Sequence, residues 1–197
     1  MKQVEITAYV SDDLDTAVQA LQQQGFVVSG RGRVDDKYLS QATEPVSEDN
    51  VLDILSRAVL LRHIVDDGKI YKKITYKKKA YLNGEVLSEE KYTIPCEDLD
   101  TAERLFSALG FRLLVKVGYD VIGMQKGDVR FAFQVVDGLG VMVECESPRD
   151  FSTASVTEIK QEKERLADLL KSVGLNIGAD TDVKKAKELL LKTRRRS

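Results

Sequence analysis

Charged side chains alternate with apolar ones in several segments of this chain, a spacing that places charges of both signs on one face of a β-strand. Glu5 lies on such a face near the N-terminus, as do Lys73 and Lys77 further along and Glu144 and Glu146 near residue 145. In an ordinary sandwich these faces would meet bulk water. In a barrel they would line the interior, where carboxylates can hold a divalent metal ion and cations can bind a polyanion.

The composition narrows the possible functions. The 197 residues suit one domain, or one domain with a helical appendage, and the net charge of −2 gives no general attraction to nucleic acid or to an anionic membrane. Cys96 and Cys145 lie far apart and His63 is the single histidine, which argues against a Cys- or His-based metal site. No apolar run reaches the length of a membrane span. We therefore expect a cytoplasmic protein without a nucleic-acid or membrane partner.

The apolar periodicity predicts the elements that must position these charges. Helices are expected between Ser11 and Gly25 and at 51–57, 98–109, 155–173 and 182–192. Strands are expected at 2–10, 26–39, 58–65, 69–78, 79–82, 85–94, 111–122, 128–136 and 140–147. Asp66-Asp67-Gly68 and Asn83-Gly84 are typical of tight turns between strands. About eight strands, mostly in hairpins, can close into a barrel without exposed edges.

A series of short motifs follows this order of elements. They are Gly25-Phe26, Asp36-Lys37-Tyr38, Leu61-Arg62, Ile74-Thr75-Tyr76-Lys77, Leu109-Gly110-Phe111, Val115-Lys116 and the segment 136–146. The series resembles the CYTH superfamily, the triphosphate tunnel metalloenzymes, which includes class IV adenylate cyclases and thiamine triphosphatases. The resemblance covers residues 1–190, and its most specific part is Gly138-Leu139-Gly140 leading to Glu144 and Glu146.

The resemblance implies an α+β fold, an antiparallel eight-stranded β-barrel (the triphosphate tunnel) with helices packed outside and a C-terminal helical segment. Residues 1–150 would form the barrel domain, and the helices of 151–197 would pack on the same domain. The implied ligand is a triphosphate-containing small molecule with Mg²⁺ or Mn²⁺, and a homodimer would be unsurprising. The implied metal ligands are Glu5, Glu144 and Glu146. The implied substrate-binding residues are Arg62, Lys73, Lys77, Lys116 and Arg130.

The chain departs from the family pattern at five positions. Gln3 stands where the family has a glutamate, Thr7 where it has a lysine, Ile64 and Gly118 where it has arginines, and Gln134 where it has an aspartate. Each change removes a charge from the expected tunnel. Metal affinity without a phosphate ligand should therefore be weak, and any catalysis should be slow.

Two functions from different classes remain open at this stage. In the first, the protein is a metal-dependent enzyme that hydrolyses a triphosphate (a nucleotide, thiamine triphosphate or inorganic triphosphate) or cyclises ATP. In the second, it is a catalytically impaired CYTH-like module that binds nucleotide or polyphosphate in a regulatory or binding role. The sequence does not decide between them, and it assigns no catalytic residue. A barrel with charged strand faces in solvent and no small-molecule ligand is a third, weaker reading.

Overall fold

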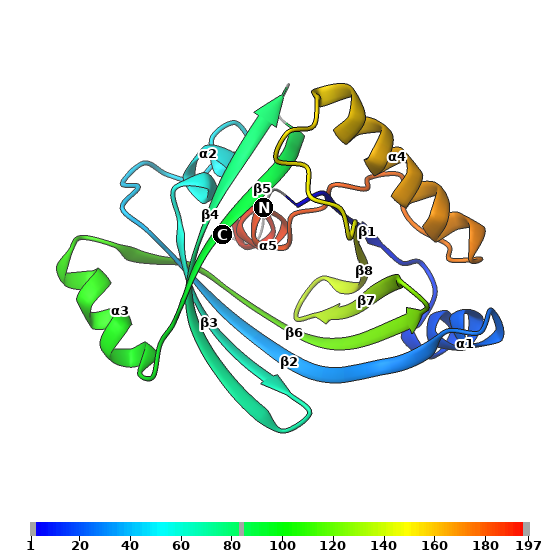
Figure 1. Cartoon of the computed structure of the whole chain (residues 1–197). Helices are drawn as coiled ribbons and strands as arrows, with labels where there is room; N and C mark the ends of the chain where they lie inside the picture. The colour runs from blue at the N-terminus through cyan, green and yellow to red at the C-terminus, as the bar shows by residue number, and fades with distance from the viewer. Residues whose placement is uncertain (1–2, 83–84, 195–197) are drawn as a thin grey trace.

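One antiparallel sheet of eight strands forms the framework of the computed structural model, which describes residues 3–82 and 85–194. The strands are β1 (Glu5–Tyr9), β2 (Val27–Ser40), β3 (Val59–Asp66), β4 (Lys69–Leu82), β5 (Glu85–Pro95), β6 (Arg112–Lys126), β7 (Val129–Val136) and β8 (Gly140–Glu146). Their order in the sheet is β1-β8-β7-β6-β2-β3-β4-β5. The sheet curls strongly, so that it has one concave and one convex face (Figure 1). The predicted eight-stranded antiparallel architecture is confirmed.

The sheet is not closed by hydrogen bonds, because an irregular segment lies along the outer edge of β1. Thr7 N–H donates to the Thr181 carbonyl at 3.1 Å, and Val183 N–H donates to the Thr7 carbonyl at 3.0 Å. Gly178 N–H makes a similar bond of 2.9 Å to the carbonyl of Tyr9. We call residues 176–183 the strap. It occupies backbone groups of β1 that would otherwise be free to pair with β5.

Helices cover both faces of the sheet. They are α1 (Leu14–Gln23), α2 (Val51–Ser56), α3 (Leu99–Ala108), α4 (Val156–Ser172) and α5 (Lys185–Arg194). α1 and α4 pack on the convex face of β1, β8 and β7, where Ile6, Phe131, Phe133, Val143 and Cys145 are buried with Leu21 and Leu166. α3 packs on the convex face further along the sheet, over Leu39 and Leu61.

The C-terminal helix α5 lies on the other face of the sheet from α1, α3 and α4. α5 lies within the curve of the sheet (Figure 1). Val183 and Ala186 are buried there, against Val34, Tyr119 and Met142 of the concave face. The physical reason is that this part of the concave face is apolar, so the apolar side of α5 removes both surfaces from water.

Local sequence explains where the elements begin and turn. Ser155 and Glu158 form a reciprocal capping box at the start of α4. The predicted turn between β3 and β4 is confirmed, with Asp67 at φ 46° and Gly68 at φ 80°. The predicted turn at Asn83-Gly84 lies outside the described residues. Among the described helices, none has both the length and the apolar character needed to cross a bilayer.

Candidate functional site

The strand register brings most of the predicted charged residues to the concave face. Glu5 lies directly opposite Glu146, and the next pair on this face is Thr7 with Glu144. Further along the sheet, Arg62 of β3 is aligned with Asp36 of β2 and with Lys73 of β4. Lys77 is aligned with Lys91 of β5. Directly opposed residues share a face, so residues far apart in sequence meet inside the curve of the sheet.

A cavity of about 100 Å³ lies between the concave face and the start of α5. Its charged lining consists of two carboxylates and five cations, namely Glu5, Glu144, Arg62, Lys77, Lys91, Lys184 and Lys185. Thr7, Tyr38 and Tyr119 complete the polar part of its wall. The excess of cations makes this interior suited to an anion.

Lys185 lines the cavity and contacts three other side chains. Its Nζ donates to Oε1 of Gln134 at 2.5 Å and lies 3.3 Å from Oε2 of Glu144. The same ammonium group lies 4.6 Å from the centroid of the Tyr119 ring, in cation–π contact. Nε2 of Gln134 donates to Glu144 at 3.1 Å, so amide, carboxylate and ammonium form one network.

Glu5 is the second carboxylate of the cavity, and lysines surround it. Lys91 Nζ lies 3.6 Å from its Oε2, which links β1 to β5 across the gap between the two edges. Burial alone would raise the pKa of Glu5, but the positive charges of Lys77, Lys91, Lys184 and Lys185 outweigh it and lower the pKa to about 2. Glu5 therefore stays ionised at neutral pH.

Arg62 is bound by a carboxylate that the sequence analysis did not assign to the site. Asp36 accepts two hydrogen bonds of 2.7 Å from Nε and the terminal nitrogen Nη2 of Arg62, and the Asp36 side chain is only 2% exposed. Burial would lower the pKa of Arg62, but these bonds and the charge of Asp36 raise it above its usual value. The guanidinium is thus permanently charged and held in one orientation.

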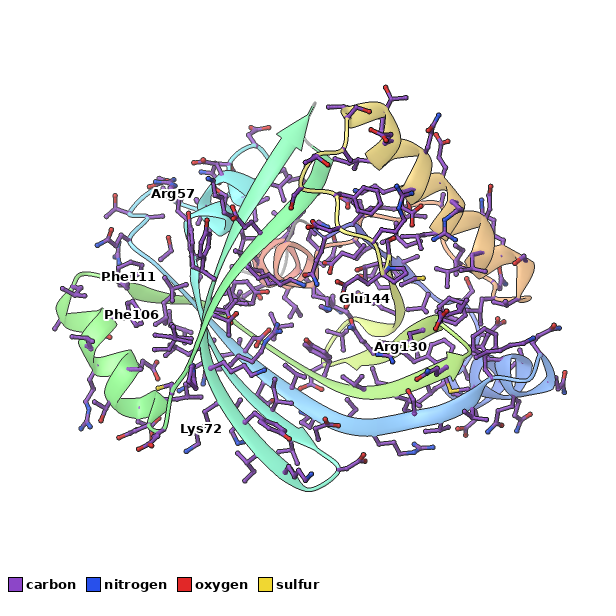
Figure 2. All side chains as sticks on the ribbon, in the orientation of Figure 1. Arg57, Lys72, Phe106, Phe111, Arg130 and Glu144 are labelled. Carbon is purple, nitrogen blue, oxygen red and sulfur yellow. The ribbon has the colours of Figure 1, made fainter. Side chains whose placement is uncertain are left out.

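A larger, more open cavity of about 700 Å³ adjoins the first one and shares Glu144 with it. Arg130, Glu146 and Ser29 line this second cavity. Figure 2 shows Arg130 and Glu144 on the same side of the sheet. Lys73 also shares the concave face by register, and its Nζ lies 5.9 Å from the centroid of the Tyr71 ring. The two predicted residues Arg130 and Glu146 therefore extend the site rather than form its centre.

The expectation that Lys116 faces the interior is wrong. Its neighbours Val115 and Val117 pack in the concave cluster beneath α5, and strand alternation sends Lys116 to the convex face. There it is aligned with Lys37 and lines a separate cavity of about 360 Å³ that also contains His63 and Lys72. Figure 2 shows Lys72 on this outer side, toward α3.

Gly118 also faces the convex side, so it does not mark an arginine missing from the interior. A Cβ at this position would lie 2.3 Å from the Arg33 guanidinium and 2.4 Å from the Asp137 carboxylate. Arg33 forms ion pairs with Asp35, Asp120 and Asp137 at this point. Glycine is therefore explained by the ion pairs packed over the backbone.

Three cations of the cavity were not assigned to the site from the sequence, namely Lys91, Lys184 and Lys185. The only sequence signal for Lys184 and Lys185 is that they lie together at the start of a helix with apolar residues. From the sequence alone, such lysines look the same as lysines exposed to solvent, because nothing shows that this helix lies inside the curve of the sheet.

The carboxylates expected to bind a metal share one face but do not form a metal site in this arrangement. Among the side chains that the structure describes, no group of three or more from Asp, Glu, His or Cys is positioned to hold a metal ion. Lys185 contacts Glu144, and Lys91 contacts Glu5. The residues present therefore do not fit a resident Mg²⁺ or Mn²⁺, whose coordination needs several free oxygen ligands at once.

Comparison with solved structures shows where this fold occurs. The protein PH1819 from Pyrococcus horikoshii is 21% identical over 98% of this chain and 99% of its own, with a TM-score of 0.74. A "putative adenylate cyclase" from Vibrio parahaemolyticus is 18% identical over 96% and 97% of the two chains, with a TM-score of 0.64. HpAC1 from Hippeastrum, whose description reports a dominant triphosphatase activity, is 13% identical over 97% and 96%, with a TM-score of 0.59.

Comparison of the sequence with protein-family models and with curated proteins finds no match. The structural similarity nevertheless extends over nearly the whole length of each chain compared. The protein therefore has a CYTH-like fold, as the order of its motifs predicted.

Proposed function

We propose that the concave cavity binds a triphosphate. The observation that supports this is the charge of its lining, where five cations face two carboxylates. A triphosphate carries several negative charges in a short chain of oxygen atoms, and lysine and arginine side chains are the usual groups that neutralise it. The fold supports the same ligand, because similar structures include a putative adenylate cyclase and a protein described as a triphosphatase.

The two adjoining cavities suit different parts of such a ligand. The inner cavity, with a volume of about 100 Å³, is the smaller of the two and has room for only a small group. The outer cavity of about 700 Å³ falls within the usual size range of small-molecule sites. In the proposed complex, the terminal phosphate enters the inner cavity and the rest of the ligand lies in the outer one, next to Arg130.

Binding without fast chemistry is the form of this function that the geometry supports best. A general base works well when its pKa lies near the working pH, whereas the pKa of Glu5 is about 2. Glu144 is held in the network with Lys185 and Gln134, and Arg62 is held by Asp36. Hydrolysis of the triphosphate, or cyclisation of ATP, is the second candidate function, and the similarity to HpAC1 supports it.

A ligand panel tests the proposal. ATP, thiamine triphosphate and inorganic tripolyphosphate are each added with Mg²⁺, with Mn²⁺ and with EDTA. Thermal stabilisation, phosphate release and cyclic nucleotide are measured in the same samples. We expect at least one triphosphate to raise the melting temperature without turnover. Turnover with loss in a Glu144→Gln/Glu146→Gln variant would establish the enzymatic function instead.

A matched pair of lysines controls for non-specific charge. Lys77 lines the inner cavity, whereas its neighbour Lys78 is exposed on the opposite face of β4. Lys77→Met should abolish most of the ligand-induced stabilisation, and Lys78→Met should leave it unchanged. Equal loss in both variants, or no stabilisation of the wild type by any ligand in the panel, would contradict binding in this cavity.

A further inference from the structure

We propose that Lys185, assisted by Lys91, takes the place of a divalent metal ion in this cavity, so that the protein binds triphosphate without a metal. This inference rests on the proposed function and concerns the cation that assists it. Metal sites and ammonium groups satisfy the same need, which is positive charge between a carboxylate wall and a phosphate. In this chain the positive charge is covalently part of the protein.

The first argument is the position of the ammonium groups relative to the carboxylates. Lys185 Nζ lies 3.3 Å from Glu144, and Lys91 Nζ lies 3.6 Å from Glu5. A Mg²⁺ ion at either carboxylate would have to displace a lysine and also lose part of its own hydration shell. Both steps oppose metal binding, so the lysines exclude the metal as well as replace it.

The second argument is the chemistry of Gln134. Its amide accepts a hydrogen bond from Lys185 through Oε1 and donates one to Glu144 through Nε2. An ionised aspartate at this position could accept from the lysine but could not donate to the carboxylate, and its charge would repel Glu144. The amide thus fits an ammonium–carboxylate pair, whereas a further carboxylate would fit a metal ion.

The third argument is that Lys185 is held in place. The strap along β1 fixes the backbone just before it, through the bond between Val183 N–H and the Thr7 carbonyl. The ring of Tyr119, 5% exposed, contacts the ammonium from a second side. The Lys185 side chain itself is only 15% exposed. A cation positioned in advance binds an anion at a lower entropic cost than one that must first be ordered.

Calorimetric titration of inorganic tripolyphosphate into the protein tests the inference. The titration is run at constant ionic strength with EDTA, and again with Mg²⁺ and with Mn²⁺. For the wild type we expect binding in EDTA that is at least as tight as in either metal. Titration of Mg²⁺ alone should give no binding heat.

Variants of Lys185 identify the group responsible. Lys185→Met keeps most of the length of the side chain and removes its charge, and it should weaken binding in EDTA by about tenfold, equivalent to about 1.4 kcal/mol. It should also make binding tighter in Mg²⁺ than in EDTA, because Glu144 is released. Lys185→Arg should preserve binding in EDTA. Lys187→Met, on the same helix but lining a different cavity, should behave as the wild type.

The outcomes separate the two proposals. Wild-type binding that requires Mg²⁺ or Mn²⁺ would overturn metal replacement and leave triphosphate binding intact. A Lys185→Met variant that melts like the wild type but binds equally well in EDTA would also overturn it. Absence of binding under all three conditions would overturn the proposed function itself, and with it this inference.

Discussion

Two carboxylate–cation pairs on the concave face differ in geometry. The difference distinguishes a pair that stabilises the fold from a pair that we expect to take part in ligand binding. Asp36 and Arg62 form two parallel hydrogen bonds of 2.7 Å, with the carboxylate 2% exposed. Glu144 and Lys185 are 3.3 Å apart, with side chains 26% and 15% exposed. A guanidinium fork occupies both oxygens of its partner, whereas an ammonium group is a compact point charge that can attract a second anion from the same position. The first pair therefore contributes mainly to the framework, and we expect a ligand to engage the second.

Removing Arg62 should produce the largest effect on stability. Arg62→Ala leaves the charge of Asp36 buried without its partner, and we expect a loss of about 3–5 kcal/mol in the free energy of unfolding. Urea denaturation at neutral pH measures it. The double variant Asp36→Leu/Arg62→Met, which leaves no unpaired charge, should recover most of the loss. A loss no larger than that of Lys185→Met would remove the distinction between the two pairs.

Acidification should weaken the fold through Glu5. Its folded pKa of about 2 lies below the usual glutamate pKa of 4.5, so ionised Glu5 contributes stability that is complete above pH 4.5. That contribution, roughly 3 kcal/mol, is lost as the pH falls toward 2. Denaturation curves across this range should show a steeper decline for the wild type than for Glu5→Gln. Parallel declines would show that the surrounding lysines do not hold Glu5 ionised.

Neutralising Glu144 should change binding more than stability. Glu144→Gln removes a negative charge that competes for Lys185, so tripolyphosphate affinity in EDTA should rise about fivefold, equivalent to about 1 kcal/mol. The unfolding free energy should change by less than about 1 kcal/mol, because the pair is partly exposed. If Glu144 instead held a metal needed for binding, the same variant would bind more weakly, so calorimetry distinguishes the cases by sign.

The smallest effect is expected on the convex face. Lys116→Met should alter tripolyphosphate affinity by less than about twofold and stability by less than about 0.5 kcal/mol, since Lys116 is exposed on the face opposite the cavity. Lys77→Met, assayed in parallel by calorimetry, provides the contrasting loss. A large effect of Lys116→Met would mean that the alternation along β6 does not separate the two faces functionally.

The elements of this fold were readable from the sequence because each carries its own local signal. Alternation predicted a strand at 140–147, and the structure has β8 at Gly140–Glu146. Helical spacing predicted a helix at 155–173, and α4 spans Val156–Ser172. In β1 and β8, alternation also gave the correct face for Glu5 and Glu144, because the convex side there is covered by α1 and α4.

The same rule failed on β6 because the apolar face of that strand is the concave one. Val115, Val117 and Tyr119 are apolar where α5 packs against them, so taking the polar side as the interior placed Lys116 on the wrong face. The destination of α5 is a long-range property. Its apolar residues predict that it packs somewhere, but nothing local to 182–192 specifies the inside of the sheet.

The strap along β1 makes the two edge strands of the sheet, β1 and β5, different from each other. Backbone groups of β1 are already bonded to residues 176–183, whereas β5 ends the sheet on the other side. An open strand edge is a template for pairing with a strand of another molecule. Because residues 176–183 already occupy backbone groups of β1, the strap protects this edge from such pairing as well as fixing the start of α5.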